Sequence, residues 1–137
     1  MTKEELYLKT IFCCIACDGN IATEEVDMVR DLCAKDRIFH NLDSEEYLNS
    51  WITEINEQGG AFLQTYLKEI NSVELNEQEQ LLLVSLAIKA IEADNSIEYS
   101  EVKFFKKIRS KLTISDEAIL AEHPDKEDFS LARYQHN

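Results

Sequence analysis

The chain has 137 residues, a formal net charge of −13 and 45% hydrophobic residues. This apolar content excludes intrinsic disorder, and three Gly with one Pro are too few for the many turns of an all-β fold. An excess of negative charge repels the phosphates of nucleic acids. We therefore expect no nucleic-acid partner, and instead a cation or a basic protein partner.

The sequence predicts a protein that does not insert into a membrane. No basic segment is followed by an apolar leader, and no apolar run approaches the roughly 18 residues of a membrane-spanning helix. We expect a cytoplasmic protein. In that compartment its four cysteines are expected as thiols rather than disulfides.

The spacing of hydrophobic residues predicts seven helices. They cover residues 3–17, 22–38, 45–57, 61–70, 77–93, 98–111 and 116–122. Thr2 and Asn76 each precede a glutamate by three residues, which is the spacing of a helix-capping box. Ser44 is the expected cap of the third helix. The first and fifth helices are apolar on almost every side, so we expect them at the centre of the fold.

No segment has the two-residue period of a strand, so the predicted fold class is all-α. We expect a compact bundle of about seven helices in a single domain, residues 1–124. Pro124 ends this domain. The tail, residues 125–137, either docks onto the bundle or remains loose.

Two short stretches repeat one pattern. CDGNIATEEV, residues 17–26, and ADNSIEYSEV, residues 93–102, align at a constant offset of 76 residues, which places Asp18 on Asp94 and Glu25 on Glu101. Each stretch joins a central helix to an amphipathic one. Gly19 suits the left-handed conformation that ends a helix. We expect an internal repeat with pseudo-twofold symmetry.

The repeated pattern matches the second half of a calcium-binding EF-hand loop. The first half is missing, because the first ligand position of that loop falls on Cys14 and on Ala90. A true EF hand is therefore excluded, yet several carboxylates remain that could bind a divalent cation. The candidate metal-binding residues are Glu92, Asp94, Glu98 and Glu101 in the second copy, and Asp18 and Glu25 in the first.

The same residues also suit a purely structural role. Asp18 and Asp94 can accept hydrogen bonds from the amides that follow them, and Glu25 and Glu101 stand where a glutamate closes a helix cap. In this interpretation Ile21 and Ile97 hold each turn against the core. The sequence leaves both interpretations open.

The duplicated motif, read as ACDGNIATEEV and EADNSIEYSEV, resembles the TerB-like, tellurite-resistance-associated family, which is related to the helical domain of DjlA-type co-chaperones. The resemblance covers residues 5–122. It implies a seven-helix bundle with internal pseudo-twofold symmetry, and a non-enzymatic role in stress response or metal sensing with a protein partner. The acidic positions that it implies are Asp18, Glu25, Asp94 and Glu101. Asn95 departs from the usual glycine of the family.

Other chemistry has weaker signals. Cys13, Cys14 and Cys17 could bind a soft metal or metalloid, but cysteines in an apolar helix usually behave as small buried hydrophobes. No nucleophile elbow, P-loop or dinucleotide-binding glycine run is present, so we expect no enzyme. The alternative function is a scaffold that binds another protein through an apolar surface patch.

Overall fold

The computed structural model describes residues 1–93 and 97–124. Within these residues the chain forms seven α-helices and one short 3-10 helix, without a strand, which confirms the all-α prediction. The helices are α1 (Lys3–Ile15), α2 (Thr23–Lys35), η1 (Arg37–Phe39), α3 (Ser44–Gln58), α4 (Gly60–Ile70), α5 (Glu77–Glu92), α6 (Tyr99–Arg109) and α7 (Asp116–Glu122). Asp94 and the tail, residues 125–137, lie outside the described residues.

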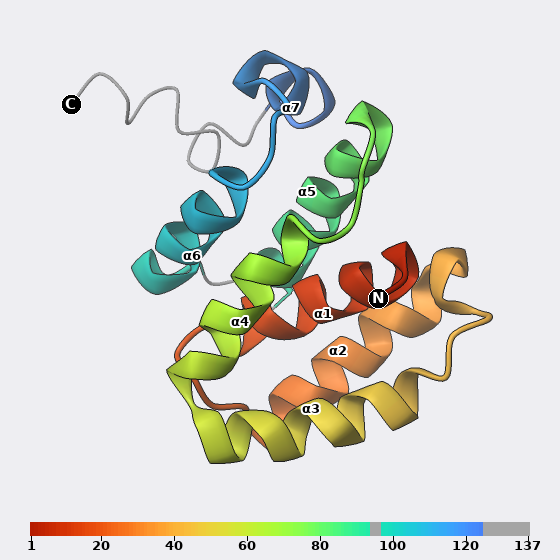
Figure 1. Ribbon diagram of the computed structural model, residues 1–137, viewed down its shortest axis with the longest axis vertical. Helices are drawn as coiled ribbons and strands as arrows, with labels where there is room; N and C mark the ends of the chain where they lie inside the picture. Colours follow the sequence, from red (N-terminus) through yellow and green to blue (C-terminus); the bar gives the residue numbers. More distant parts are fainter. Residues whose placement is uncertain (94–96, 125–137) are drawn as a thin grey trace.

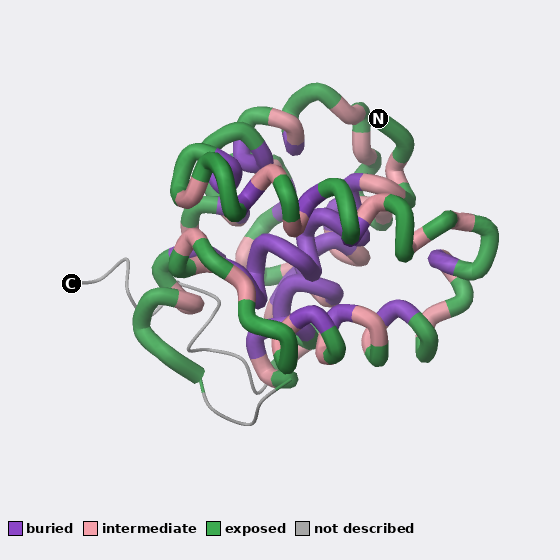
Figure 2. Tube along the Cα trace, turned by 90° about the horizontal axis from the view of Figure 1, so that it is seen from below, coloured by how far each residue is buried: buried purple, intermediate pink, exposed green. Residues whose placement is uncertain are grey.

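Helix α1 forms the centre of the bundle. It packs against α2, α4, α5 and α6, and in Figure 1 it runs through the middle of the fold. All residues from Leu6 to Ala16 are buried, and Figure 2 shows this buried segment surrounded by helices with exposed outer faces. Helix α5 packs more extensively on α1 than any other helix does. The predicted central position of both helices is confirmed.

Local capping sets the start of several helices. The Thr2 hydroxyl accepts a hydrogen bond from the Glu5 amide at 3.1 Å. At the start of α5 the capping box is complete, because the Asn76 side chain accepts from the Glu79 amide and the Glu79 carboxylate accepts from the Asn76 amide, both at 2.9 Å. The sequence predicted that Ser44 caps α3, and this prediction is wrong. Asp43 caps α3 instead, with Oδ1 accepting from the Glu46 amide at 3.2 Å.

The predicted helix 22–38 is two elements. Helix α2 ends at Lys35, and Asp36 is extended, with φ −116° and ψ 124°. The Asp36 carboxylate accepts a hydrogen bond from the Ile38 amide at 3.2 Å and so begins η1. An aspartate side chain that bonds the backbone in this way competes with continuation of the helix.

The first acidic turn packs against the α3–α4 junction. Gly19 has φ 89°, as predicted for a left-handed residue after a helix, and a Cβ there would lie 3.2 Å from the Gly60 nitrogen. Gly59 has φ 57°. A side chain at position 19 would therefore crowd the backbone at the start of α4, and glycine at this position allows the close approach.

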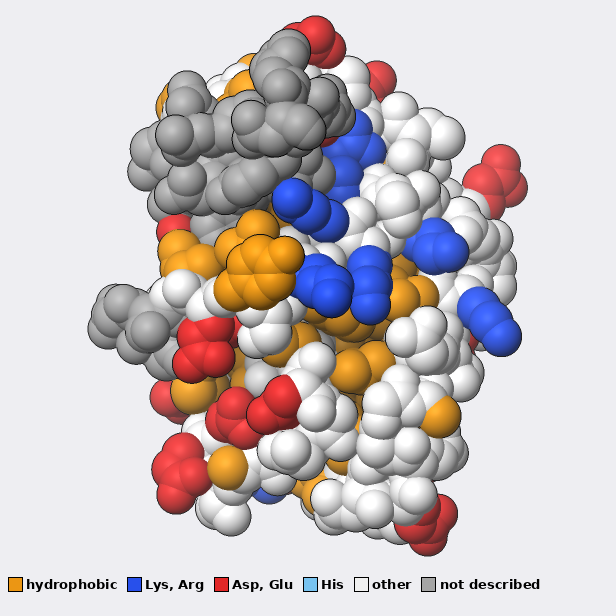
Figure 3. All heavy atoms as spheres, turned by 90° about the vertical axis from the view of Figure 1, so that its left-hand side faces the viewer, with side chains coloured by type: hydrophobic (Ala, Val, Ile, Leu, Met, Phe, Trp, Pro, Cys, Tyr) orange, Lys and Arg blue, Asp and Glu red, His pale blue; other side chains and the backbone are white. Residues whose placement is uncertain are grey.

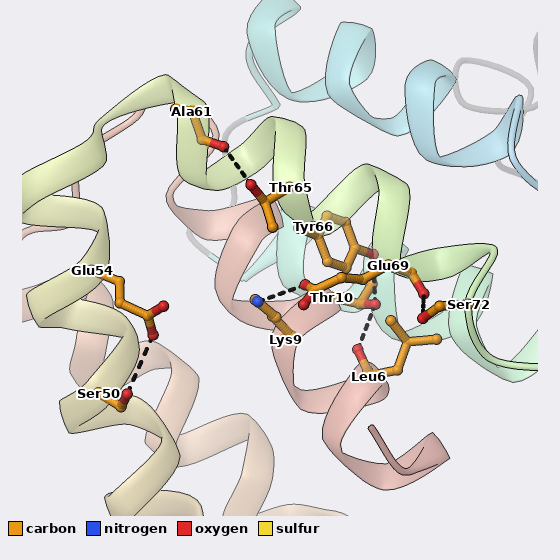
Figure 4. Close-up of polar contacts among 10 residues, drawn as sticks. All are labelled: Leu6, Lys9, Thr10, Ser50, Glu54, Ala61, Thr65, Tyr66, Glu69 and Ser72. Carbon is orange, nitrogen blue, oxygen red and sulfur yellow. Dashed lines mark hydrogen bonds and ion pairs between the residues drawn. The ribbon is translucent and has the colours of Figure 1, made fainter.

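Two polar pairs, one buried and one partly buried, join α1 to α4 (Figure 4). The Lys9 ammonium lies 2.6 Å from the Glu69 carboxylate, and the Thr10 hydroxyl lies 2.6 Å from the Tyr66 hydroxyl. Thr10 also lies 2.8 Å from the Leu6 carbonyl oxygen, which accepts its hydroxyl hydrogen bond. These pairs explain how two polar residues fit in an otherwise apolar central helix.

Candidate functional site

The two acidic motifs lie side by side in the folded chain. A small pocket of about 70 Å³ has two acidic residues from each motif in its lining: Asp18, Glu25, Glu98 and Glu101. Ile15, Cys17 and Ser100 complete its lining. The Cys17 sulfur lies 4.0 Å from the Ser100 hydroxyl, so this contact links the two motifs directly. We call this set of seven residues the acidic pocket.

Helix starts position the two half-buried glutamates. Glu25 accepts a hydrogen bond from the Ala22 amide at 2.8 Å at the start of α2, and Glu101 accepts one from the Glu98 amide at 2.9 Å at the start of α6. The predicted capping role of both glutamates is thus confirmed. Because both glutamates line the pocket, the first turns of α2 and α6, where the helix dipole is positive, lie beside it.

The other two acids of the pocket, Asp18 and Glu98, are more open to solvent. Asp18 is exposed and accepts a hydrogen bond from the Asn20 amide at 3.3 Å, as the capping interpretation predicts. Glu98 is exposed, and its side chain makes no capping hydrogen bond. Glu98 and Asp18 therefore contribute charge to the pocket that the helix caps do not depend on.

Not every predicted site residue reaches this pocket. Glu92 is the last residue of α5, is half-buried and does not line it. Asp94 lies outside the described residues. Ser100, which directly precedes Glu101, was missed by the sequence reasoning, and its position beside a candidate ligand was the only signal for it. Ile97 was predicted to hold its turn against the core, but 46% of its surface is exposed. Ile21 does pack against the core.

The described residues contain no group of three or more His, Cys, Asp or Glu side chains arranged to hold a metal ion. Asp94 is not covered by this finding, because it lies outside the described residues. The acidic pocket has room for a few water molecules, since one water needs only about 10–15 Å³ of such space. It therefore suits a hydrated ion or a terminal ammonium group better than an organic substrate.

The four thiols are poor ligands near neutral pH. Burial raises the pKa of Cys13 and Cys14 well above the usual thiol value, and raises the pKa of Cys33 to about 12. Cys17 lies beyond the end of α1 and is half-buried; burial, with a smaller effect of the Glu101 charge, raises its pKa to about 11. A soft metal binds the thiolate, so this arrangement disfavours a Cys13 and Cys17 metal or metalloid site.

Charge is segregated on the surface next to the site. On the face drawn in Figure 3, basic side chains gather in one band and acidic side chains gather below it. Helix α6 carries exposed lysines, including Lys103 and Lys107. Tyr99, at the start of the same helix, has 82% of its surface exposed. Both charges and an aromatic ring are therefore available to a partner protein near the acidic pocket.

In the part of the chain that the structure describes, no helix has both the length and the apolar character needed to cross a membrane. Comparisons with protein families, with curated proteins and with solved structures found no match to this chain.

Proposed function

We propose that this protein is a non-enzymatic, TerB-like interaction module whose acidic pocket receives a positively charged group. The observation that carries the proposal is the pocket itself, because acids that stand far apart in the sequence, Asp18 and Glu25 against Glu98 and Glu101, line one small space. The resemblance in sequence implies a role in stress response or metal sensing, with a protein partner.

Like charges meet in this pocket. Four carboxylates around one pocket produce a concentrated negative potential, and a bound cation relieves their repulsion. The volume of about 70 Å³ is far below the roughly 300–1,000 Å³ of sites for drug-sized ligands. A hydrated divalent cation and the ammonium of a partner's lysine offer the same charge at a suitable size.

The test uses a variant that removes charge and preserves the helix caps. Asp18→Asn with Glu98→Gln leaves the Glu25 and Glu101 hydrogen bonds in place. The matched control, Glu57→Gln with Glu117→Gln, changes the net charge equally at exposed positions outside the pocket. Calorimetric titrations use calcium, magnesium, manganese and zinc in one series, and a tetralysine peptide at low salt in another.

We expect the pocket variant to bind its ligand at least about fivefold more weakly than the control variant, as for the loss of one or two partly exposed charge pairs. If the metal titration shows this pattern, the ligand is a divalent cation. If the peptide titration shows it, the ligand is a basic protein segment. If the unaltered protein binds neither at millimolar concentration, the proposal is wrong.

The capping hydrogen bonds favour a second candidate, a scaffold in which the motifs only join helices. In that case Glu101→Ala lowers thermal stability by removing the bond to the Glu98 amide. Asp18→Asn with Glu98→Gln then leaves the binding of every tested cation and peptide unchanged. The two candidate functions therefore predict different binding of cations and peptides by Asp18→Asn with Glu98→Gln.

A further inference from the structure

A second pocket lies over α1, between α2 and α5. Its volume is about 180 Å³, and its lining combines apolar with charged side chains: Ile11, Leu32, Lys35, Asp36, Leu86 and Lys89. Helices α2 and α5 both pack against α1, as Figure 1 shows, and α1 contributes Ile11 to the lining. Ile11 and Leu86 are only 1% and 2% exposed, so they form the apolar floor. We call this the α2–α5 pocket.

The volume suits one compact apolar group. An apolar protein cavity of about 150 Å³ accommodates benzene. The α2–α5 pocket is slightly larger and has Ile11, Leu32 and Leu86 along its apolar side. A benzene-sized group can therefore leave water and contact three aliphatic side chains.

The charges at this pocket favour an anion. Lys35 and Lys89 are both exposed, and within residues 1–93 and 97–124 neither of them forms an ion pair. Asp36 is the one acid in the lining, and its carboxylate already accepts the Ile38 amide hydrogen bond. Two lysines and one aspartate leave a single net positive charge.

We propose that the α2–α5 pocket binds a small monocarboxylic acid with an apolar group about the size of a benzene ring. The apolar group lies on Ile11, Leu32 and Leu86. The carboxylate lies between Lys35 and Lys89. This site is separate from the acidic pocket, which selects the opposite charge.

The test is a titration of the full-length, isotopically labelled protein with phenylacetate, followed by nuclear magnetic resonance at the amides of Leu32, Asp36 and Leu86. Two comparison ligands separate the contributions. Phenylacetamide keeps the ring without the charge, and acetate keeps the charge without the ring. We expect saturable, millimolar binding of phenylacetate, and binding of each comparison ligand that is at least about fivefold weaker.

Lysine variants test the charge. Lys35→Gln with Lys89→Gln should weaken phenylacetate binding about fivefold or more, because two partly exposed charge pairs are lost. Lys68→Gln with Lys107→Gln is the matched control, since it removes two exposed lysines outside the pocket and should leave binding unchanged. All four positions are exposed, so both variants should fold as the unaltered protein does, which circular dichroism checks.

Four results would overturn the proposal. They are the absence of saturable shifts at these amides, equal binding of phenylacetamide, equal weakening by the control variant, and tighter binding of N-acetyl-glycyl-phenylalanine than of phenylacetate. The last result would assign the pocket to the carboxyl terminus of a peptide instead of a free acid.

Discussion

The ammonium of Lys9 lies 2.6 Å from the carboxylate of Glu69, and this ion pair joins the middle of the central helix α1 to α4. Lys9 is 5% exposed. Its ammonium also lies 4.8 Å from the centre of the Phe62 ring and 5.7 Å from that of the Trp51 ring. A buried ammonium therefore depends on one carboxylate and two aromatic faces for stabilisation.

Glu69→Gln should reduce the free energy of unfolding by about 3 kcal/mol, because it leaves the Lys9 ammonium buried without its counter-charge. Lys9→Met together with Glu69→Gln should recover most of this loss, since the buried charge is then absent. Urea unfolding of the single and double variants measures both values. Strictly additive effects would contradict the coupling of the two residues.

Tyr66→Phe should reduce the free energy of unfolding by about 1–2 kcal/mol, because the Thr10 hydroxyl loses a buried hydrogen-bond partner at 2.6 Å. Tyr99→Phe is the control, because Tyr99 is 82% exposed and the same atom is lost there. Thermal unfolding compares the two. Equal effects would show that the Thr10–Tyr66 pair contributes nothing specific.

Glu25→Ala and Glu101→Ala should each cost about 1 kcal/mol of stability, through loss of a capping hydrogen bond to a helix start. Glu24→Ala is a matched control in the first turn of α2, because it removes an exposed charge near the helix dipole without a capping bond. Denaturant unfolding gives the three values. The capping role would be refuted if Glu24→Ala cost as much as Glu25→Ala.

Stability should fall with rising pH above the usual thiol pKa of 9. Burial raises the pKa of Cys33 to about 12 in the folded chain, so between pH 9 and pH 12 the unfolded chain has released a proton that the folded chain still holds. The contribution is complete below pH 9 and is lost as the pH rises through the folded pKa. Cys33→Ala should therefore show a shallower decline of unfolding free energy over this range. An unchanged slope would contradict the assignment.

A thiol reagent should modify Cys17 slowly in the native protein and the other three cysteines only after unfolding. Cys13 and Cys14 are 0% exposed and Cys33 is 6% exposed, whereas Cys17 is half-buried with a pKa raised to about 11. The rate of modification with and without denaturant, compared with Cys17→Ala, measures this. Rapid native modification of Cys13 would revive the metalloid-binding alternative.

The sequence was sufficient for those features that depend on neighbours within a turn or two of helix. Hydrophobic spacing predicted the seven helices, and the Thr2 and Asn76 caps were read from residues three positions apart. The capping roles of Glu25 and Glu101 were also readable, because cap geometry is local. The cap prediction at Ser44 was wrong because the adjacent aspartate could make the same local bond and did so.

Contacts between distant residues required the tertiary structure. In the sequence Lys9 is one of the few polar residues of an apolar helix, but its partner Glu69 comes from another helix 60 positions away. The candidate acids could be named one by one, whereas their meeting in a single pocket, without Glu92, depends on how α6 lies beside α1. The α2–α5 pocket likewise exists only because two helices lie over a third. By itself the sequence thus determined most of the helices and several of their caps, since these follow from local hydrogen bonding and hydrophobic period. Packing alone decided which charges and apolar surfaces share a site, because it brings together side chains that no local pattern relates.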